Sequence, residues 1–462
     1  MCGISKAMPC GGAFHRVCQL FSFCSFLFSF SYGVFMKKSL FILACLVMLG
    51  CHESENDTPN LPSNDGQSGK LKVSQKVTQV YSETDNVESV RAIVDGTHVP
   101  SAIVVSSKAR TVREIWLDGD KIVQAAAFHD AEGKADDEFT NSAVLSEGVY
   151  LLTKTILSRE DDKIVDCSGE LYMAHAGEPV SVSVGAMPDA VAITPDKRYA
   201  ITADERDSEA EAWGKCPVAS EKPSVTFVSL KDNIATSEVV KTVQFTQNAL
   251  GPREPEYVAV SSDNDTVAVT LQDSHEVAIL KISEVMAASG SILDESVAKI
   301  VQLPANASGA NPWPDGIAAF EVEEKTYFVI AGEWNDTLII IDAEGTVVSN
   351  TMVTEREVPT SFPCIEDNES PRYSPDSVTT FEVDSKVYVA ATLRFAGAVI
   401  IYDVTNPQHP QFVHIEAVGE SDTTGCSQDG SRVYPEGISS GNGYIWTANE
   451  GENSVTVFKV EP

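Results

Sequence analysis

The sequence predicts an all-β protein of the β-propeller class, a ring of seven blades with six as the alternative. Three observations lead to this prediction. A proline followed by a carboxylate recurs about every 60 residues. Short β-rich segments without helical periodicity lie between the recurrences, and the last repeat lacks one strand. A closed ring of such units buries both faces of every blade and leaves only short edges exposed.

The repeat is clearest in the C-terminal half, where five units begin with the same pair. The pair is a proline and an acidic residue, starting at Pro188, Pro255, Pro314, Pro375 and Pro435. Three segments rich in β-branched and aromatic residues follow each pair, as at 257–260, 267–270 and 277–280. Turn-forming residues separate the segments. The spacing is typical of short antiparallel strands.

The two ends of the chain complete the ring in this prediction. Two weaker units lie around 99–127 and 143–173, and because they are degenerate the count of seven keeps six as its alternative. The last unit ends at Pro462 after three strands. We expect residues 71–81 to supply its fourth, outer strand.

Two stretches resemble a known family of propeller repeats. They are EPEYVAVSSDNDTVAVTLQDSHEVAIL (254–280) and YPEGISSGNGYIWTANEGENSVTVF (434–458). Both are similar to the YVTN-type repeat, and more closely to the propellers called choice-of-anchor I. The resemblance extends over about 187–462. It implies a seven-bladed surface or envelope propeller and implies no particular activity.

The N-terminal region is interpreted as a targeting signal. Met36-Lys37-Lys38, an apolar run and Gly50-Cys51 resemble a bacterial lipoprotein signal, with an ordinary cleaved secretory signal as the alternative. This divides the chain into 1–35, an extension from a misassigned start, 36–50, the signal peptide, 51–70, a polar tether, and 71–462, the propeller. Cys51 is then the lipidated residue. His52 after it resembles lipoproteins sent to the outer membrane, so we expect a lipid-anchored protein of the periplasm or cell surface.

Cysteine usage agrees with export. Four cysteines follow Cys51, none in a Cys-x-x-Cys pattern, and an even number in an oxidising compartment predicts two disulfides. Three pairings are open, and we predict Cys167–Cys216 and Cys364–Cys426.

The charge excludes one class of partner. With 33 Lys and Arg against 67 Asp and Glu, the formal net charge is −34. Such a surface repels phosphate backbones and anionic lipid, which argues against nucleic-acid binding and leaves a lipid anchor as the only membrane contact. Cationic ligands, divalent metals and basic proteins remain as partners, and simple solubility in the envelope is the alternative explanation.

Two sets of polar residues recur where a propeller opens on one face, which we call the top face. The first set follows the prolines and is predicted to form a partial ring of carboxylates: Asp189, Glu256, Asp315, Asp376 and Glu436. The second set closes the second strand of each unit: Glu205, Gln272, Glu333, Arg394 and Glu450. Trp334 lies beside them. Arg394 breaks the symmetry, and we expect it to pair with carboxylates, with an anionic ligand group as the alternative.

The chemistry of the ring has two interpretations. Oxygen ligands suit Ca²⁺ or another hard cation. Alternatively, each carboxylate accepts backbone N–H bonds at a tight turn that is repeated five times. The histidines are scattered, His275 is expected to be solvated, and no nucleophile elbow, phosphate loop or zinc motif is present. The sequence therefore favours a non-catalytic envelope lipoprotein that binds a ligand or a protein, with a metal-dependent lactonase-like hydrolase as the alternative.

Overall fold

The computed structural model describes residues 71–462, apart from 83–84, 131–132, 134–136, 161–162, 176–178, 207–221, 232–233, 360–361, 363–372 and 421–432. By internal contacts the chain divides into Met1–Gly66 and Gln67–Pro462. The predicted signal, Cys51 and the tether lie outside the described residues. In the part described, no helix is both long and apolar enough to cross a membrane.

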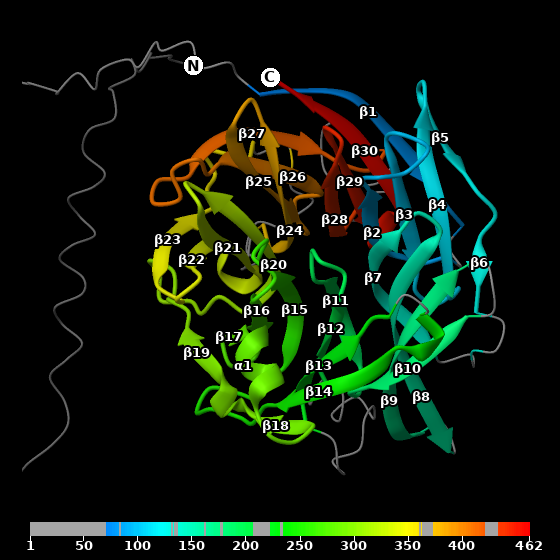
Figure 1. The fold of residues 1–462 in the computed structure, drawn as a ribbon. Helices are drawn as coiled ribbons and strands as arrows, with labels where there is room; N and C mark the ends of the chain where they lie inside the picture. Colours follow the sequence, from blue (N-terminus) through cyan, green and yellow to red (C-terminus); the bar gives the residue numbers. More distant parts are fainter. Residues whose placement is uncertain are drawn as a thin grey trace, which may run out of the picture. The chain divides into compact units, whose positions relative to one another are not determined.

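Residues 72–461 form seven antiparallel sheets arranged as the blades of a propeller (Figure 1). Blades 1 to 3 contain β2 (Val87–Ile93), β3 (Ser101–Ser106), β4 (Thr111–Asp118), β5 (Lys121–Gln124) and β6 (Phe128–His129), then β7 (Glu138–Ser146), β8 (Val149–Glu160), β9 (Lys163–His175) and β10 (Val180–Val184), then β11 (Pro188–Ile193), β12 (Tyr199–Asp204), β13 (Ser224–Ser229) and β14 (Glu238–Gln244).

Blades 4 to 7 contain β15 (Pro255–Val260), β16 (Thr266–Leu271), β17 (Glu276–Lys281) and β19 (Ala298–Gln302), then β20 (Pro314–Val322), β21 (Lys325–Gly332), β22 (Thr337–Asp342) and β23 (Val347–Met352), then β24 (Pro375–Val383), β25 (Lys386–Leu393), β26 (Ala398–Asp403) and β27 (Gln411–Ala417), then β28 (Pro435–Gly441), β29 (Tyr444–Asn449), β30 (Ser454–Glu461) and β1 (Lys72–Val80). The prediction of seven blades rather than six is confirmed.

Helix is scarce in the structure. Among the described residues the single α-helix is α1 (Ile282–Ala287), in a segment inserted between β17 and β19. The same segment carries β18 (Ile292–Asp294), which pairs in parallel with the outer strand β14 of blade 3. Short 3₁₀ turns are η2 (Ile234–Thr236), η3 (Glu295–Val297), η4 (Glu333–Asn335) and η5 (Glu450–Glu452).

The first and last strands close the ring. β1 pairs antiparallel with β30, with Lys72 opposite Glu461 and Val80 opposite Ser454, so the N-terminal strand completes blade 7 as predicted (Figure 1). The innermost strand of each blade lies beside those of its two neighbours, and β28 lies beside β2. Each innermost strand is the end of its own sheet and is hydrogen-bonded on one side only, and it packs beside the innermost strands of the neighbouring blades.

The hydrophobic core lies between the blades. One cluster joins blades 5 and 6 and another joins blades 3 and 4. Trp446, the largest fully buried side chain, packs between blades 7 and 1 with Val90 and Ile115. Because the apolar faces meet across the blade interfaces, the centre of the ring is left to the first residues of the innermost strands.

The innermost strand of every blade has a β-bulge near its start. In five blades the strand begins with proline, which is tolerated there because the first residue need not donate to the ladder. In blades 1 and 2 the bulge follows Val87 and Phe139 instead. A bulge redirects the side chain that it carries, so the next residue of all seven strands faces the same mouth of the ring.

The disulfide predictions fall largely outside the described residues. Cys167, buried in β9, is disulfide-bonded. Cys216, Cys364 and Cys426 lie in segments that are not described, so the pairs Cys167–Cys216 and Cys364–Cys426 stay predictions.

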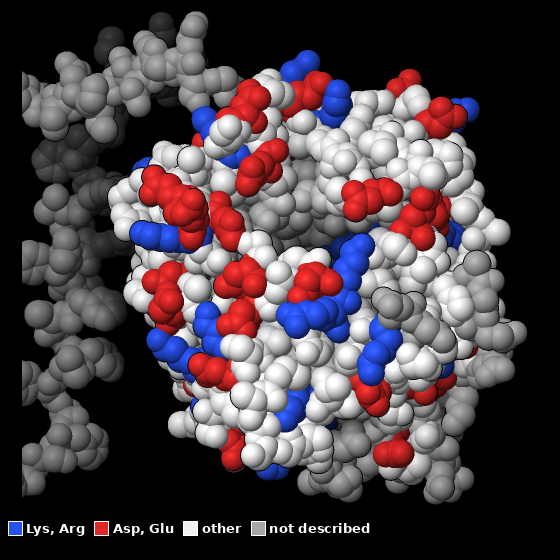
Figure 2. All heavy atoms as spheres, viewed as in Figure 1, with Lys and Arg blue, Asp and Glu red and all other residues white. Residues whose placement is uncertain are grey.

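On the face shown in Figure 2, acidic and basic side chains are interspersed around a central hollow. The net negative charge is therefore not gathered there as one acidic patch. Acidic residues that lie close together are found at the starts of the innermost strands, such as Glu88 and Glu436.

Candidate functional site

The first predicted set occupies one position in five blades. Each member is the second residue of an innermost strand, directly at the bulge: Asp189, Glu256, Asp315, Asp376 and Glu436. The structure adds Glu88, at the same position of blade 1, and Thr140, at that of blade 2. We call these seven residues the acidic ring. Sequence reasoning missed Glu88 because Val87 stands where five of the other strands have proline.

Burial and mutual repulsion shift the pKa values of the ring carboxyls upward. Burial, together with the charge of Glu450, raises the pKa of Glu88 to about 8. Burial raises the pKa of Asp189 to about 6. The same two causes raise the pKa values of the remaining four carboxyls, and here the repelling neighbours include other ring members: Glu256, Asp315, Asp376 and Glu436. The ring therefore holds its full negative charge poorly at neutral pH without a cation.

The second predicted set is held against the ring by a repeated backbone hydrogen bond. In five blades, the N–H of the residue after the second strand donates to the carbonyl of the residue before the innermost strand, at 2.9–3.1 Å. The donors are Glu205, Gln272, Glu333, Arg394 and Glu450, and the acceptors are Met187, Glu254, Trp313, Ser374 and Tyr434. The structure thus brings both predicted sets to the same mouth.

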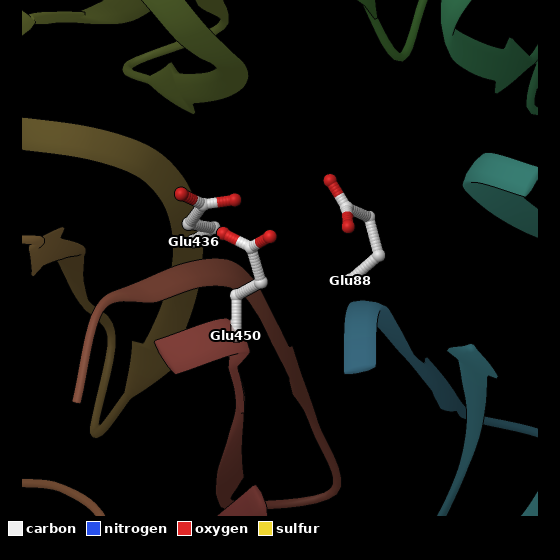
Figure 3. Close-up of side chains that lie close together, drawn as sticks. All are labelled: Glu88, Glu436 and Glu450. Atoms are coloured by element: carbon white, nitrogen blue, oxygen red, sulfur yellow. The ribbon is translucent and has the colours of Figure 1, made fainter. Parts of the chain in front are cut away.

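Two groups of three carboxylates result. In each group, one carboxylate oxygen from every member lies within 4.8 Å of the others. One group is Glu88, Glu436 and Glu450, whose carboxylates come from β2, β28 and η5 and face a common gap (Figure 3). The other is Asp189, Glu205 and Glu256. Oxygen donors at this spacing suit a hard divalent cation.

The interpretation of the ring as a repeated hydrogen-bonded turn is not supported. Among the described residues, no backbone N–H donates to any of the six ring carboxylates. The hydrogen bonds that they accept come from side chains, such as Asn86 Nδ2 to Glu88 at 3.2 Å and Gln272 Nε2 to Asp315 at 3.4 Å. The carboxylates therefore face the mouth rather than the turn.

Arg394 pairs with carboxylates. Its Nη2 lies 2.6 Å from Glu436 Oε1 and its Nη1 lies 3.2 Å from Glu333 Oε1. Its guanidinium also covers the Tyr434 ring, 5.6 Å from the centroid. Burial acts to lower the pKa of Arg394, but the charges of Glu436 and Asp376 outweigh burial and raise it. The guanidinium is thus a fixed cation within the ring.

Side chains cross the channel one residue deeper than the ring. Asn141 Nδ2 and Ser377 Oγ both donate to Tyr257 Oη, at 3.0 and 3.2 Å, although the three residues belong to blades 2, 6 and 4. Arg91 Nη2 donates to Asn141 Oδ1 at 2.9 Å. Burial raises the pKa of Tyr257, which keeps its hydroxyl protonated. These residues form a floor beneath the acidic ring.

Aromatic side chains line one side of the mouth, on blades 4 and 5. The rings of Trp313 and Trp334 are 5.7 Å apart, and His275 lies 5.8 Å from Trp313. Trp334 is 46% exposed. The expectation that His275 is solvated is wrong, because its side chain is only 7% exposed and burial lowers its pKa. Sequence reasoning did not detect this packing because the residues come from three different loops.

No family model and no curated protein sequence matches the chain. The fold has counterparts. Virginiamycin B lyase of Staphylococcus aureus superposes with a TM-score of 0.53 at 13% identity, over 84% of this chain and 99% of that one. The periplasmic gluconolactonase of Pseudomonas aeruginosa gives 0.49 at 11% identity, over 85% and 95%.

Of these two, only the likeness to the lyase is close enough to support the fold, and it supports nothing finer. At 13% identity the likeness to the lyase agrees with a β-propeller and says nothing of shared chemistry. The function has to be argued from the mouth of the ring.

Proposed function

We propose that this protein is a non-catalytic cell-envelope binding protein whose acidic ring binds a cation. The observation that carries the proposal is the imbalance of charge at the mouth. Six carboxyl groups from six blades converge there, those of Glu256 and Asp376 buried and the other four half-buried, and the guanidinium of Arg394 neutralises part of that charge. A buried carboxylate is costly unless it is paired or protonated. A bound cation restores the charged form without that cost.

The finer identity rests on the sequence. We propose a lipoprotein of the choice-of-anchor I kind, acylated at Cys51 and held at the outer membrane. The YVTN-like repeats and the signal before Cys51 support it. Metabolic labelling with a palmitate analogue tests it: label is expected in the wild type and not in Cys51→Ser, and an unlabelled wild type would contradict it.

Calcium binding tests the ring. Purified protein stripped with EDTA is titrated with CaCl₂ by calorimetry. We expect a dissociation constant of about 10⁻³ M or tighter, the range of extracellular calcium modules. Glu88→Gln and Glu256→Gln each remove a ligand from one carboxylate group, so at least one of them should weaken binding about tenfold.

The matched control is Glu382→Gln, at the opposite end of β24 from the ring. Its affinity for calcium should equal that of the wild type. The proposal fails if 10 mM calcium, roughly ten times the weakest expected constant, gives no heat of binding, or if all three variants bind alike.

A second function has one observation in its favour. In the metal-free ring Glu88 and Asp189 have pKa values of about 8 and about 6, so whichever of the two does not bind the metal can exchange protons near neutral pH. Carboxyls tuned in this way serve as general acids and bases. The alternative is therefore a metal-dependent lactonase-like hydrolase. EDTA-sensitive turnover of a lactone or ester that is lost in Asp189→Asn would establish it, and absence of turnover across a lactone panel leaves the binding function.

A further inference from the structure

The side chain of Arg394 occupies a site that is suited to an organic cation. In blades 5 to 7, the guanidinium of Arg394 lies over Tyr434 and pairs with Glu436 and Glu333. Each partner has a defined position in the repeat. Tyr434 precedes the proline of blade 7, Glu436 belongs to the acidic ring, and Glu333 follows the second strand of blade 5. An aromatic face and two carboxylates together are a strong recognition set for guanidinium.

The same positions recur two blades earlier with one substitution. Trp313 stands where Tyr434 does, Asp315 where Glu436 does, and Glu205 where Glu333 does. The position of Arg394 is taken by Gln272, which is neutral. Gln272 Nε2 reaches Asp315 Oδ2 at 3.4 Å, just as the Arg394 guanidinium reaches Glu436. We call Trp313, Asp315, Glu205 and Gln272 the Trp313 site.

The surroundings of the Trp313 site are suited to a ligand. Trp334 extends the aromatic wall and is 46% exposed. On the other side of Trp313, His275 is only 7% exposed, and its Nδ1 makes no hydrogen bond of good geometry among the described residues, although the backbone of Gln272 acts to raise the pKa of the imidazole. A buried polar atom without a partner costs free energy and calls for an explanation. A ligand group placed beside Trp313 would supply a partner for it.

The carboxylates strengthen the case for a cation. Glu205 belongs to the group with Asp189 and Glu256, whose oxygens lie within 4.8 Å of one another. An indole face is the best cation–π acceptor among the aromatic side chains. The Trp313 site thus offers an aromatic face and carboxylates, as the surroundings of Arg394 do.

We infer that the Trp313 site binds the guanidinium group of an external ligand, in the way that the Tyr434 position binds Arg394. The inference rests on the proposed function, because it names the class of cation that the acidic mouth takes. The guanidinium stacks on Trp313 and bridges Asp315 and Glu205. Its source is either a free small molecule or an arginine side chain of a partner protein.

Calorimetry with three small probes tests the inference on EDTA-treated full-length protein. Arginine amide should bind at one site. Citrulline amide, which has the same shape without the guanidinium charge, should bind at least tenfold more weakly, and lysine amide should fall between them. Equal binding of arginine amide and citrulline amide would overturn the inference. An acetylated peptide with one internal arginine separates the two sources, since tighter binding than arginine amide indicates a protein partner and equal binding a small molecule.

Substitutions at position 272 give the sharpest test. Gln272→Arg installs the tethered guanidinium that blade 6 already has, so it should abolish binding of arginine amide. Gln272→Met removes the contact with Asp315 without adding a charge, so it should still bind one arginine amide, and the loss in Gln272→Arg can then be assigned to the added guanidinium. Trp313→Leu should weaken binding about tenfold. Wild-type affinity in Gln272→Arg would refute the site.

Arg394→Gln provides an independent measurement. It empties the Tyr434 position, so the stoichiometry of arginine amide should rise from one to two. A stoichiometry that stays at one in a variant with wild-type circular dichroism would count against the inferred equivalence. Calcium titration of the same sample separates the two proposals, because calcium binding without arginine binding refutes only the Trp313 site.

Discussion

Glu88 lies in the acidic ring although Val87, and not proline, precedes it. Of the two ring carboxyls with a defined pKa, Glu88 and Asp189, Glu88 has the larger shift. Burial and the neighbouring Glu450 raise its pKa from the usual 4.5 to about 8. The folded state thus holds this proton more tightly than the unfolded state does. The resulting stabilisation is complete below pH 4.5 and is lost as the pH rises through about 8.

The direction of this pKa shift predicts how Glu88→Gln changes stability. The amide is uncharged at every pH, so without metal the variant should be more stable than the wild type at pH 8, by on the order of 1–2 kcal/mol. Near pH 4.5 the two should be equal. Urea unfolding in EDTA at both pH values measures this, with Glu382→Gln as the control. A wild type that is more stable than Glu88→Gln at pH 8 would contradict the raised pKa.

The single hydroxyl of Tyr257 connects three blades across the channel. Its Oη accepts from Asn141 and Ser377. Tyr257→Phe leaves both donors without this acceptor, which typically costs about 1–3 kcal/mol. Urea unfolding should show that loss in Tyr257→Phe and no loss in Tyr327→Phe, whose ring stacks on Phe320 near the other end of the strands. Equal stability of the two variants would show that the floor contributes nothing.

Among the elements, β1 is the one that the repeat required and that no local pattern marked. A ring whose last blade has three strands needs a fourth, and residues 71–81 were the segment with suitable composition. The structure pairs Lys72–Val80 with β30. Thr78 adds side-chain hydrogen bonds to Thr456 and to the carbonyl of Gly419, both at 3.0 Å.

Deletion of residues 71–80 should therefore open the ring. It exposes β30 as an unpaired edge, so we expect aggregation and a melting temperature lower by 10 °C or more, an order of magnitude set by losing a whole outer strand. Removal of residues 52–66 is the matched control, since it shortens the chain before the compact unit begins at Gln67. Size-exclusion chromatography and thermal unfolding compare the two. An unchanged melting temperature after the first deletion would mean that β1 does not close the ring.

The sequence predicted the positions of the five blades that begin with the repeated proline, and it predicted the positions of the other two only approximately. Five blades could be placed from the pairs beginning at Pro188 to Pro435. Blades 1 and 2 were located only approximately, because Val87 and Phe139 replace the proline and because the long strands β8 and β9 depart from the usual length. The carboxylate ring was predictable from symmetry. Trp334 was expected beside the second set, but the packing of His275 against Trp313 and the channel floor were not predictable, because both depend on side chains from different blades meeting in space.

In the intact propeller, proton binding and cation binding by the acidic ring are coupled. Cations and protons compete for the same carboxyl groups, and burial has made those groups bind protons more tightly than usual. In the metal-free folded protein, Glu88 and Asp189 hold their protons at pH 5, because their pKa values are about 8 and about 6. By pH 8, Asp189 is ionised and Glu88 is about half ionised, so repulsion within the ring is greater than at pH 5. Calcium should then bind mainly at the higher pH.

The last prediction is therefore a pH-dependent stabilisation by calcium. A ligand that binds only the folded state stabilises it by RT ln(1 + [L]/Kd), about 1.4 kcal/mol at the tenfold excess that 10 mM calcium gives over a Kd of about 10⁻³ M, and more if binding is tighter. For a chain of this size that corresponds to a few degrees. Thermal unfolding at pH 8 should show this rise with 10 mM calcium (order of magnitude from the expected affinity) and lose it with EDTA, while at pH 5 calcium should have little effect. A rise of equal size at both pH values would place the calcium outside the acidic ring, since those carboxyls cannot bind it equally well when protonated.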